Sequence, residues 1–170
     1  MTQESDLVTI QYASVNFRDI MLATGRLAVE VFGTNRLDQE CILGFEYAGL
    51  NKKGEKVMGT VISGAMATHV VPEPHLMWKV PSNWSLQDAA TCPVVYITVY
   101  TAFFLNNPIS EGKSILIHAG SGGVGLAAIR IALAYGMNVY TTVSNSQKKQ
   151  FLLDTFPQLR GRFNTQSLFH

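Results

Sequence analysis

Residues 114–125, SILIHAGSGGVG, decide the fold that we expect for this chain. The apolar run 114–119 reads as a buried strand, and a G-x-G-x-x-G motif follows it directly. Gly120 permits a tight turn, Gly122 leaves room for a pyrophosphate, and Gly125 lets the next helix pack against the strand. The first N–H groups of that helix, expected at residues 123–135, would face the anion. The pattern predicts a dinucleotide phosphate site rather than a glycine-rich turn without a ligand.

The sequence after this loop continues a parallel α/β pattern and indicates which cofactor binds. Residues 138–143 read as a second buried strand and residues 147–156 as a helix. An NAD site has an acidic residue at the end of the second strand, but none occurs between Gly125 and Asp154. The polar residues found there are Ser144, Ser146, Lys148 and Lys149. Because a helix N-terminus disfavours cations, the lysines predict the 2′-phosphate of NADP as their partner; the alternative is two solvated surface lysines.

The first half of the chain predicts a small barrel. Short strands are expected at residues 7–13, 56–62, 66–71 and 76–80, and a strand or bend at residues 42–50, with turns between them. A helix is expected at residues 17–24, with Asn16 as candidate N-cap, and a linking helix at residues 94–105. We place a first domain at residues 1–93, a second at residues 94–159 and a divergent tail at residues 160–170. The second domain holds two parallel strands in this interpretation.

Composition gives no sign of binding that is driven by charge. The 170 residues are 47% hydrophobic and carry a net charge of +1, which predicts neither nucleic-acid nor membrane binding. No apolar run approaches the ~20 residues that a membrane helix needs, and residues 1–6 are too polar for a signal peptide. The two cysteines, Cys41 and Cys92, are expected to be reduced. We expect a cytoplasmic protein.

Residues 8–159 also resemble a known enzyme family. The segments that carry the likeness are YASVNFRDIMLAT (12–24), LGFEYAG (43–49), KVMG (56–59), PSNW (81–84), PVVY (93–96), LIHAGSGGVG (116–125) and FPQL (156–159). They resemble the enoyl reductase domain of animal type I fatty acid synthase, in the zinc-free branch of the medium-chain dehydrogenase/reductase superfamily. Related polyketide synthase reductases and quinone reductases rank behind it. The resemblance implies an α/β fold with a β-barrel part: a GroES-like barrel segment followed by a partial Rossmann domain with a doubly wound parallel sheet.

The same resemblance implies a reaction. Such a reductase transfers a hydride from NADPH to the β-carbon of a trans-2-enoyl thioester, and a proton is added at the α-carbon. The thioester is carried by acyl carrier protein or coenzyme A, and other synthase domains are partners if the chain is part of a longer one. We name no general acid, because the stretch from Gly25 to Leu27 lacks the Tyr that several zinc-free enoyl reductases use.

Site residues follow from the resemblance one by one. Zinc-dependent relatives have Cys at the position of Asn16 and His at that of Phe45, so we expect no metal. Asn16, Phe45 and Tyr96 are candidates for the nicotinamide and substrate pocket; Asn16 is equally a candidate helix cap, and Tyr96 a candidate core residue. Thr98 lies near the nicotinamide or in the core. The cofactor-binding candidates are Thr98, Gly120, Ser121, Gly122, Gly123, Val124, Gly125, Ser144, Lys148 and Lys149.

Other residues of the matching segments carry weaker expectations. Arg18 and Asp19 are interpreted as structural, and His118 as a satisfied core histidine. Tyr12 either lines the acyl pocket or belongs to the core. Because the family continues with further Rossmann strands, we expect the isolated chain to be inactive. A zinc-free quinone reductase and a non-catalytic remnant that binds nucleotide or a partner are the alternatives, and the origin of the tail stays open.

Overall fold

The structure is a computed structural model that describes residues 7–28, 30, 42–106, 108–159 and 163–164. It divides into two compact units, Met1–Val94 and Val95–His170, which we call the first unit and the second unit. The division lies one residue from the expected boundary at residue 93, although the three-part domain assignment stays a prediction. Cys41 and most of the expected tail lie outside the described residues.

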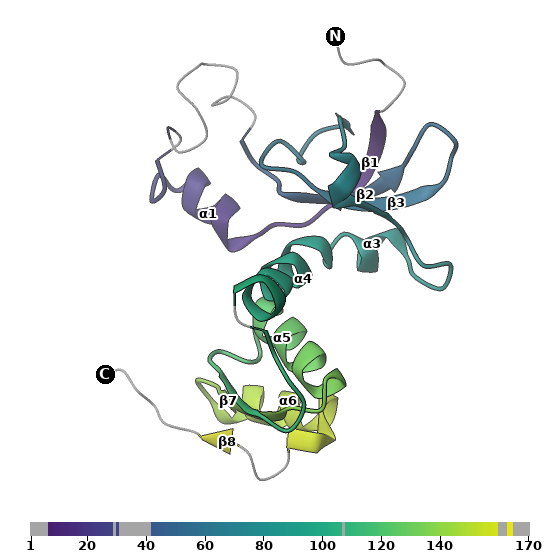
Figure 1. The fold of residues 1–170 in the computed structure, drawn as a ribbon. Helices are drawn as coiled ribbons and strands as arrows, with labels where there is room; N and C mark the ends of the chain where they lie inside the picture. The colour runs from purple at the N-terminus through teal and green to yellow at the C-terminus, as the bar shows by residue number, and fades with distance from the viewer. Residues whose placement is uncertain (1–6, 29, 31–41, 107, 160–162, 165–170) are drawn as a thin grey trace. The chain divides into compact units, whose positions relative to one another are not determined.

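The first unit is built on a five-stranded antiparallel sheet with the order β4-β1-β2-β3-β5 (Figure 1). Its elements are β1 (Val8–Ala13), α1 (Phe17–Ala23), β2 (Glu46–Leu50), β3 (Lys56–Thr60), β4 (His69–Val70), the 3₁₀ helix η3 (Pro74–Leu76), β5 (Met77–Lys79) and α3 (Leu86–Ala89). Residues 42–50, expected as a strand or bend, form a bend at Gly44, with a φ of 89°, followed by a strand that begins at Glu46. Of residues 66–71, only His69–Val70 pair.

The central strand β2 is buried on both faces. Tyr47 packs with Val8 and Val57 in one cluster, whereas Ala48 packs with Ala89 of α3 in another. Successive residues of a strand point to opposite faces, so the two clusters cover the two sides of the sheet. This double burial places the first residue of β2, Glu46, in the interior, at 1% exposure.

The second unit holds a three-stranded parallel sheet with the order β6-β7-β8. Its elements are α4 (Pro93–Tyr100), which begins at the division, the π-helix η4 (Thr101–Asn106), β6 (Ser114–Ile117), α5 (Gly123–Ala134), β7 (Asn138–Thr142), α6 (Ser146–Thr155), the 3₁₀ helix η5 (Pro157–Leu159) and β8 (Phe163–Asn164). The expectation of two parallel strands is wrong, because the two-residue β8 adds a third beside β7. The core of this unit includes the fully buried Ile129, Val139, Leu152 and Leu159.

The run Leu86–Asn106 contradicts one expectation from composition. With α3, α4 and η4 together it is long and apolar enough to cross a membrane, at a mean hydropathy of 1.4, whereas we expected no such run. However, residues 90–92 separate α3 from α4. The eight residues of α4 and the six of η4 extend about 20 Å at ~1.5 Å per residue. That length is shorter than the ~30 Å hydrocarbon core of a bilayer.

Candidate functional site

The phosphate loop of the second unit joins the end of β6 to the start of α5. Its left-handed residue is Ala119, with a φ of 53°, in a conformation that is unfavourable for a residue with a Cβ atom. The N–H of Gly122 donates to the carbonyl of Ala119 at 2.9 Å and closes the turn. Gly122 is also the N-cap of α5, which begins at Gly123. The motif expected from the sequence therefore does connect a strand to a helix.

Gly120 and Gly125 of the motif are needed for close packing rather than for positive φ. A Cβ atom on Gly120 would lie 2.0 Å from Oγ1 of Thr141, and one on Gly125 would lie 2.5 Å from the carbonyl oxygen of Ala119. A Cβ on Gly122 would meet that same oxygen only at 3.4 Å. The distance at Gly125 agrees with its expected packing role, whereas the approach of a pyrophosphate at Gly122 stays a prediction. Gly120 is a central residue of the turn that the Gly122 N–H closes onto Ala119, as expected, and its contact with Thr141 adds a second reason for glycine there.

The start of α5 offers N–H groups to an anion. The first N–H groups of any helix lack an intrahelical acceptor, and no acceptor in the described part of the chain meets those of Gly123, Val124 and Gly125. Ser121 is half-buried, and Gly122, Gly123 and Val124 are exposed. The helix dipole adds a partial positive charge at the same point. This end of the loop can therefore hold a phosphate group.

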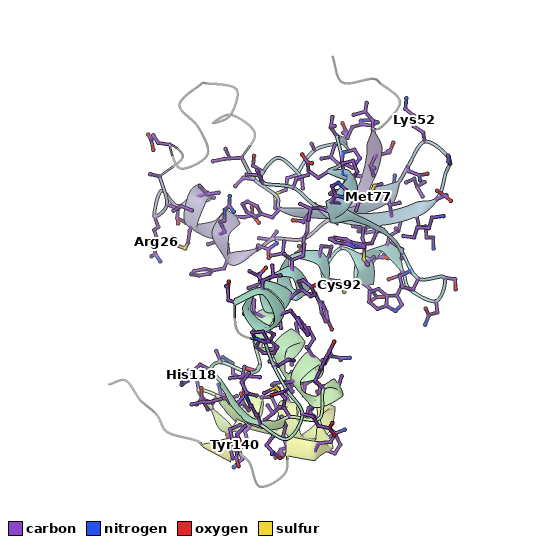
Figure 2. All side chains as sticks on the ribbon, viewed as in Figure 1. Arg26, Lys52, Met77, Cys92, His118 and Tyr140 are labelled. Atoms are coloured by element: carbon purple, nitrogen blue, oxygen red, sulfur yellow. The ribbon has the colours of Figure 1, made fainter. Side chains whose placement is uncertain are left out.

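The end of β7 holds the phosphate loop in place. The Thr141 hydroxyl, fully buried, donates to the carbonyl of Ile117 at 2.8 Å, while Oγ1 of Thr142 accepts from the N–H of Ala119 at 3.2 Å. Oγ1 of Thr142 also lies 3.2 Å from Nδ1 of His118. His118 is exposed rather than in the core as expected, and Figure 2 labels it at the edge of the second unit. The sequence analysis missed both threonines, although their position at the end of the second strand was a signal.

The candidates for the 2′-phosphate lie at the start of α6. Asn145 caps this helix, and its side chain accepts from the N–H of Lys148 at 2.9 Å. Nζ of Lys148 donates to Oγ of Ser144 at 3.1 Å. Lys149 follows one residue later and is half-buried, and the first turn of α6 has no acidic residue. The structure therefore brings Ser144 and Lys148 together after β7, where the sequence predicted them.

In the first unit, Asn16 lies at the start of α1 and is its N-cap, as one of its two expected roles required. The N–H of Asn16 donates to Oδ2 of Asp19 at 2.8 Å, and the N–H of Gly44 donates to Oδ1 of the same carboxylate at 2.7 Å. Asp19 is 3% exposed. Its carboxylate joins α1 to the bend before β2, which supports the structural role expected for it.

Glu46 is the second buried carboxylate beside α1. One of its oxygens accepts from the hydroxyl of Ser14 and, at 2.9 Å, from Nδ2 of Asn16. Its other oxygen accepts from the N–H of Val94 in the first turn of α4, also at 2.9 Å. The sequence analysis gave Glu46 no role. A single glutamate in an apolar-rich strand carries no signal that it will be buried.

Phe45 is buried at 4% exposure, and the guanidinium of Arg18 lies 3.8 Å from the centre of its ring. Arg18 also donates to the carbonyl of Ile62 at 3.2 Å. Burial lowers the pKa of Arg18 from its ordinary value, and the nearby Asp19 opposes this effect. Arg18 is therefore packed rather than free in solvent, which supports its structural role. The place of Phe45 in a substrate pocket stays a prediction.

The remaining candidates lie on α4 and β1. Tyr96 is half-buried and packs against the core of the second unit, whereas Thr98 is exposed rather than a core residue. The hydroxyl of Tyr12 accepts from Nε2 of Gln87 at 2.9 Å, and Tyr12 is 41% exposed. Roles for Tyr96 and Thr98 at the nicotinamide stay predictions. No group of three His, Cys, Asp or Glu side chains suited to a metal occurs among the residues with described positions, and the absence of zinc also stays a prediction.

Comparison with known proteins gives consistent relatives. No family model matches the chain. It is 34% identical over 147 residues to a highly reducing polyketide synthase of Didymella fabae, which covers 86% of this chain and 8% of that protein. It is 35% identical over 159 residues to the highly reducing polyketide synthase FUM1 of Gibberella moniliformis, with 91% and 6% covered. The chain thus spans a small fraction of the length of these curated relatives.

Solved structures that are similar to this chain are also reductases. The CurK enoyl reductase superposes with a TM-score of 0.75 at 27% identity, covering 91% of this chain and 51% of that one. The JamJ enoyl reductase gives 0.74 at 28% identity, with 96% and 59% covered. The quinone oxidoreductase of Thermus thermophilus, solved also with NADPH, gives 0.70 at 26% identity, with 87% and 48% covered.

These likenesses confirm the expected fold class. They support an enoyl reductase of the kind found in polyketide synthases, which we ranked behind the animal fatty acid synthase, and they do not support the fatty acid synthase type in particular. The NADPH complexes among the neighbours agree with the expected cofactor. The chain has the fold of the medium-chain dehydrogenase/reductase oxidoreductases, a GroES-like unit followed by Rossmann strands, and is similar to their NADPH-dependent enoyl reductases.

Proposed function

We propose that this chain provides the phosphate-binding loop and part of the substrate-binding unit of an NADPH-dependent trans-2-enoyl-thioester reductase. The single observation that carries the proposal is the loop from Ala119 to Gly125. Its N–H groups at the start of α5 lack an acceptor among the described residues, and Gly122 leaves room for a ligand beside them. The enoyl substrate class comes from the similarity to polyketide synthases and their enoyl reductases. We therefore favour a polyketide-type synthase over a fatty acid synthase.

The residues of the second unit fit the pyrophosphate of the cofactor. The N–H groups of Gly123, Val124 and Gly125 would donate to its oxygens, and the dipole of the 12-residue α5 favours the negative charge. Thr142 keeps Ala119 in the conformation that aims this helix end. These contacts bind and orient the cofactor but take no part in bond making.

Lys148 and Lys149 support the choice of NADPH over NADH. Cations in the first turn of a helix are unfavourable by a few tenths of a kcal/mol up to about 1 kcal/mol, and α6 has no acidic residue there to offset them. The 2′-phosphate would accept from Lys148, whose Nζ is already held by Ser144. Each charge-assisted hydrogen bond to the phosphate contributes about 1.5–3 kcal/mol.

The proposed reaction reduces a carbon–carbon double bond that is conjugated to a thioester. Bound by the phosphate loop and by Lys148, NADPH would provide the hydride for the β-carbon, and the electron pair of the double bond would take up a proton at the α-carbon. No described side chain is assigned as the proton donor. The substrate is an enoyl chain on acyl carrier protein or coenzyme A, other domains of the synthase are the partners, and the compartment is the cytoplasm.

Cofactor preference gives the direct test. We expect Lys148→Glu with Lys149→Glu to remove the preference for NADPH over NADH, roughly ten- to a hundred-fold in Kd, while NADH affinity changes little. The matched control reverses Lys52 and Lys53, which lie in an exposed turn of the first unit, and should leave both affinities unchanged. Fluorescence titration of the reduced nicotinamide measures them. Equal affinities for the two cofactors before substitution would refute the proposal.

We propose that the isolated chain of 170 residues does not catalyse the reduction of enoyl thioesters. In the described part of the chain β6 pairs only with β7, and Leu116 on β6 is 55% exposed. The solved neighbours extend to about twice the length that this chain covers. The free edge of β6 leaves backbone N–H and C=O groups without strand partners. Purified chain incubated with crotonyl-CoA and NADPH should show no oxidation of NADPH; a rate of ~1–1,000 per second would contradict this proposal.

A quinone reductase is the second candidate, because the quinone oxidoreductase of Thermus thermophilus superposes almost as well as the enoyl reductases. Initial rates of the complete reductase on crotonyl thioesters and on quinones separate the two candidates. Faster reduction of quinones would favour the alternative. NADPH binding without reduction of either substrate would indicate a non-catalytic, nucleotide-binding remnant.

A further inference from the structure

Glu46 is a buried carboxyl side chain that the proposed reaction does not use. It is 1% exposed, and no Lys, Arg or His pairs with it in the part of the chain that the structure describes. Taking a carboxylate out of water without a counter-charge costs free energy, whereas an apolar side chain of similar size would pack there without this cost. The position therefore carries a constraint beyond packing.

The constraint is visible in the hydrogen bonds around Glu46. One oxygen accepts from the Ser14 hydroxyl and from Nδ2 of Asn16 at 2.9 Å, and the other accepts from the N–H of Val94 at 2.9 Å. Val94 is the second residue of α4, so the positive end of that helix faces the carboxylate. Through these bonds Glu46 joins the end of β1, the cap of α1 and the start of α4 at one point.

These hydrogen bonds determine which side-chain atoms of Asn16 can still bind a ligand. Its side-chain nitrogen donates to Glu46 at 2.9 Å and to Oγ of Ser14 at 3.2 Å, and a carboxamide nitrogen has only two hydrogens. Because ionised carboxylate oxygens only accept, the amide cannot flip without losing the bond to Glu46. Asn16 can therefore offer a ligand only the second lone pair of its carbonyl oxygen, which also accepts from the backbone N–H of Asp19 in the capping box, and not its N–H groups.

We propose that Glu46 is a positioning residue, which fixes the amide of Asn16 so that an acceptor and not a donor is available at the start of α1. The catalytic consequence rests on the proposed function. In that reaction Asn16 does not donate to the thioester carbonyl, and it can accept from an N–H or O–H group of the cofactor or substrate.

The first test needs no activity. Glu46→Gln keeps the shape of the side chain but has one acceptor oxygen, so it can satisfy either Val94 or the pair Ser14 and Asn16. Nuclear magnetic resonance of the 170-residue chain measures hydrogen exchange of the Asn16 side-chain amide, assigned by its loss in Asn16→Ala, and of the Val94 N–H. We expect at least one of them to exchange ten-fold faster or more in Glu46→Gln.

The matched control is Glu55→Gln, a carboxylate that pairs with Lys79 on the surface of the same unit. It should leave both exchange rates unchanged. If Glu46→Gln does not fold, Ser14→Ala removes one partner of the same cluster and should speed exchange of the Asn16 amide alone. Unchanged protection of Asn16 and Val94 in Glu46→Gln, or of Asn16 in Ser14→Ala, would overturn the proposal.

The second test uses steady-state kinetics of the complete reductase. Glu46→Gln should lower kcat ten-fold or more, with the KM for NADPH changed less than two-fold. In an Asn16→Ala background the same substitution should have no further effect on kcat. An equal loss in both backgrounds would show that Glu46 acts on stability and not through Asn16. If the unsubstituted protein reduces no enoyl thioester, the proposed function fails, and the exchange measurement alone decides the positioning role.

Discussion

The two units hold their candidate functional residues in place by opposite means. The first unit buries charged side chains, with Asp19 at 3% and Glu46 at 1% exposure, and each is satisfied by N–H or O–H donors from several segments. The second unit has Thr141 as its buried polar residue in the described part, and it shapes its loop by leaving side chains out at Gly120, Gly122 and Gly125. Buried charges make a site sensitive to the loss of one partner, whereas a glycine loop is sensitive to any added atom.

The strongest test of this difference adds single methyl groups to the loop. Gly120→Ala places a Cβ 2.0 Å from Oγ1 of Thr141, so we expect the free energy of unfolding to fall by about 3 kcal/mol, at the upper end for overpacking. Gly122→Ala is the matched control, because its Cβ meets its nearest neighbour at 3.4 Å. It should change stability by less than ~1 kcal/mol and still weaken NADPH binding. Denaturant unfolding and NADPH titration measure the two effects; equal destabilisation by both variants would contradict this account of the loop.

Removal of a buried carboxylate tests the first unit. Asp19→Ala leaves the N–H groups of Asn16 and Gly44 without their acceptor, and we expect a loss of about 2 kcal/mol in the free energy of unfolding. Asp154→Ala is the control, since Asp154 accepts a single exposed hydrogen bond from Gln150. Thermal unfolding should show a clear decrease for the first variant only. A similar small change in both would mean that Asp19 is not a structural link.

Tyr47 is the exception in the first unit, because its buried hydroxyl has no hydrogen-bond partner among the described residues. Tyr47→Phe should therefore stabilise the unit by about 1–2 kcal/mol at neutral pH. Burial also raises the pKa of Tyr47 from 10 to about 12. The unfolded chain ionises first, so native stability is intact below pH ~10 and decreases as the pH rises towards ~12.

Tyr47→Phe cannot lose stability in this way, because phenylalanine does not ionise. The difference in free energy of unfolding between Tyr47→Phe and the unsubstituted protein should therefore grow between pH ~10 and ~12. Denaturant unfolding at several pH values measures it. Tyr12→Phe is the control, because the hydroxyl of Tyr12 is hydrogen-bonded to Gln87 on a partly exposed side chain. An advantage of Tyr47→Phe that stays constant across this pH range would show that the phenol titrates normally in the folded protein.

The smallest effect is expected at the end of β7. Thr142→Val removes the acceptor for the N–H of Ala119 and should lower stability by about 0.5–1 kcal/mol, with a several-fold loss of NADPH affinity. Thr155→Val removes only an exposed hydroxyl that donates to the carbonyl of Phe151 and should leave NADPH affinity unchanged. Equal affinities in the two variants would mean that Thr142 does not support the loop.

The sequence by itself determined the features that depend on neighbouring residues. The strand, glycine motif and helix around residues 114–134 and the cap at Asn16 form where the sequence predicted them. The helix expected at residues 147–156 likewise forms as α6, Ser146–Thr155. These features can be predicted from the sequence because their hydrogen bonds and steric limits involve residues only a few positions apart in the chain.

Only the tertiary structure decided which groups are buried and what they contact. The left-handed turn at Ala119, the threonines of β7 that support it and the exposure of His118 arise because β6 and β7 lie side by side, about 24 residues apart in the chain. Glu46 is buried because β2 lies between β1 and β3 and begins beside the first turn of α4. The physical reason is that burial and hydrogen-bond partners depend on segments brought together by folding, and a residue type does not reveal which segments those will be.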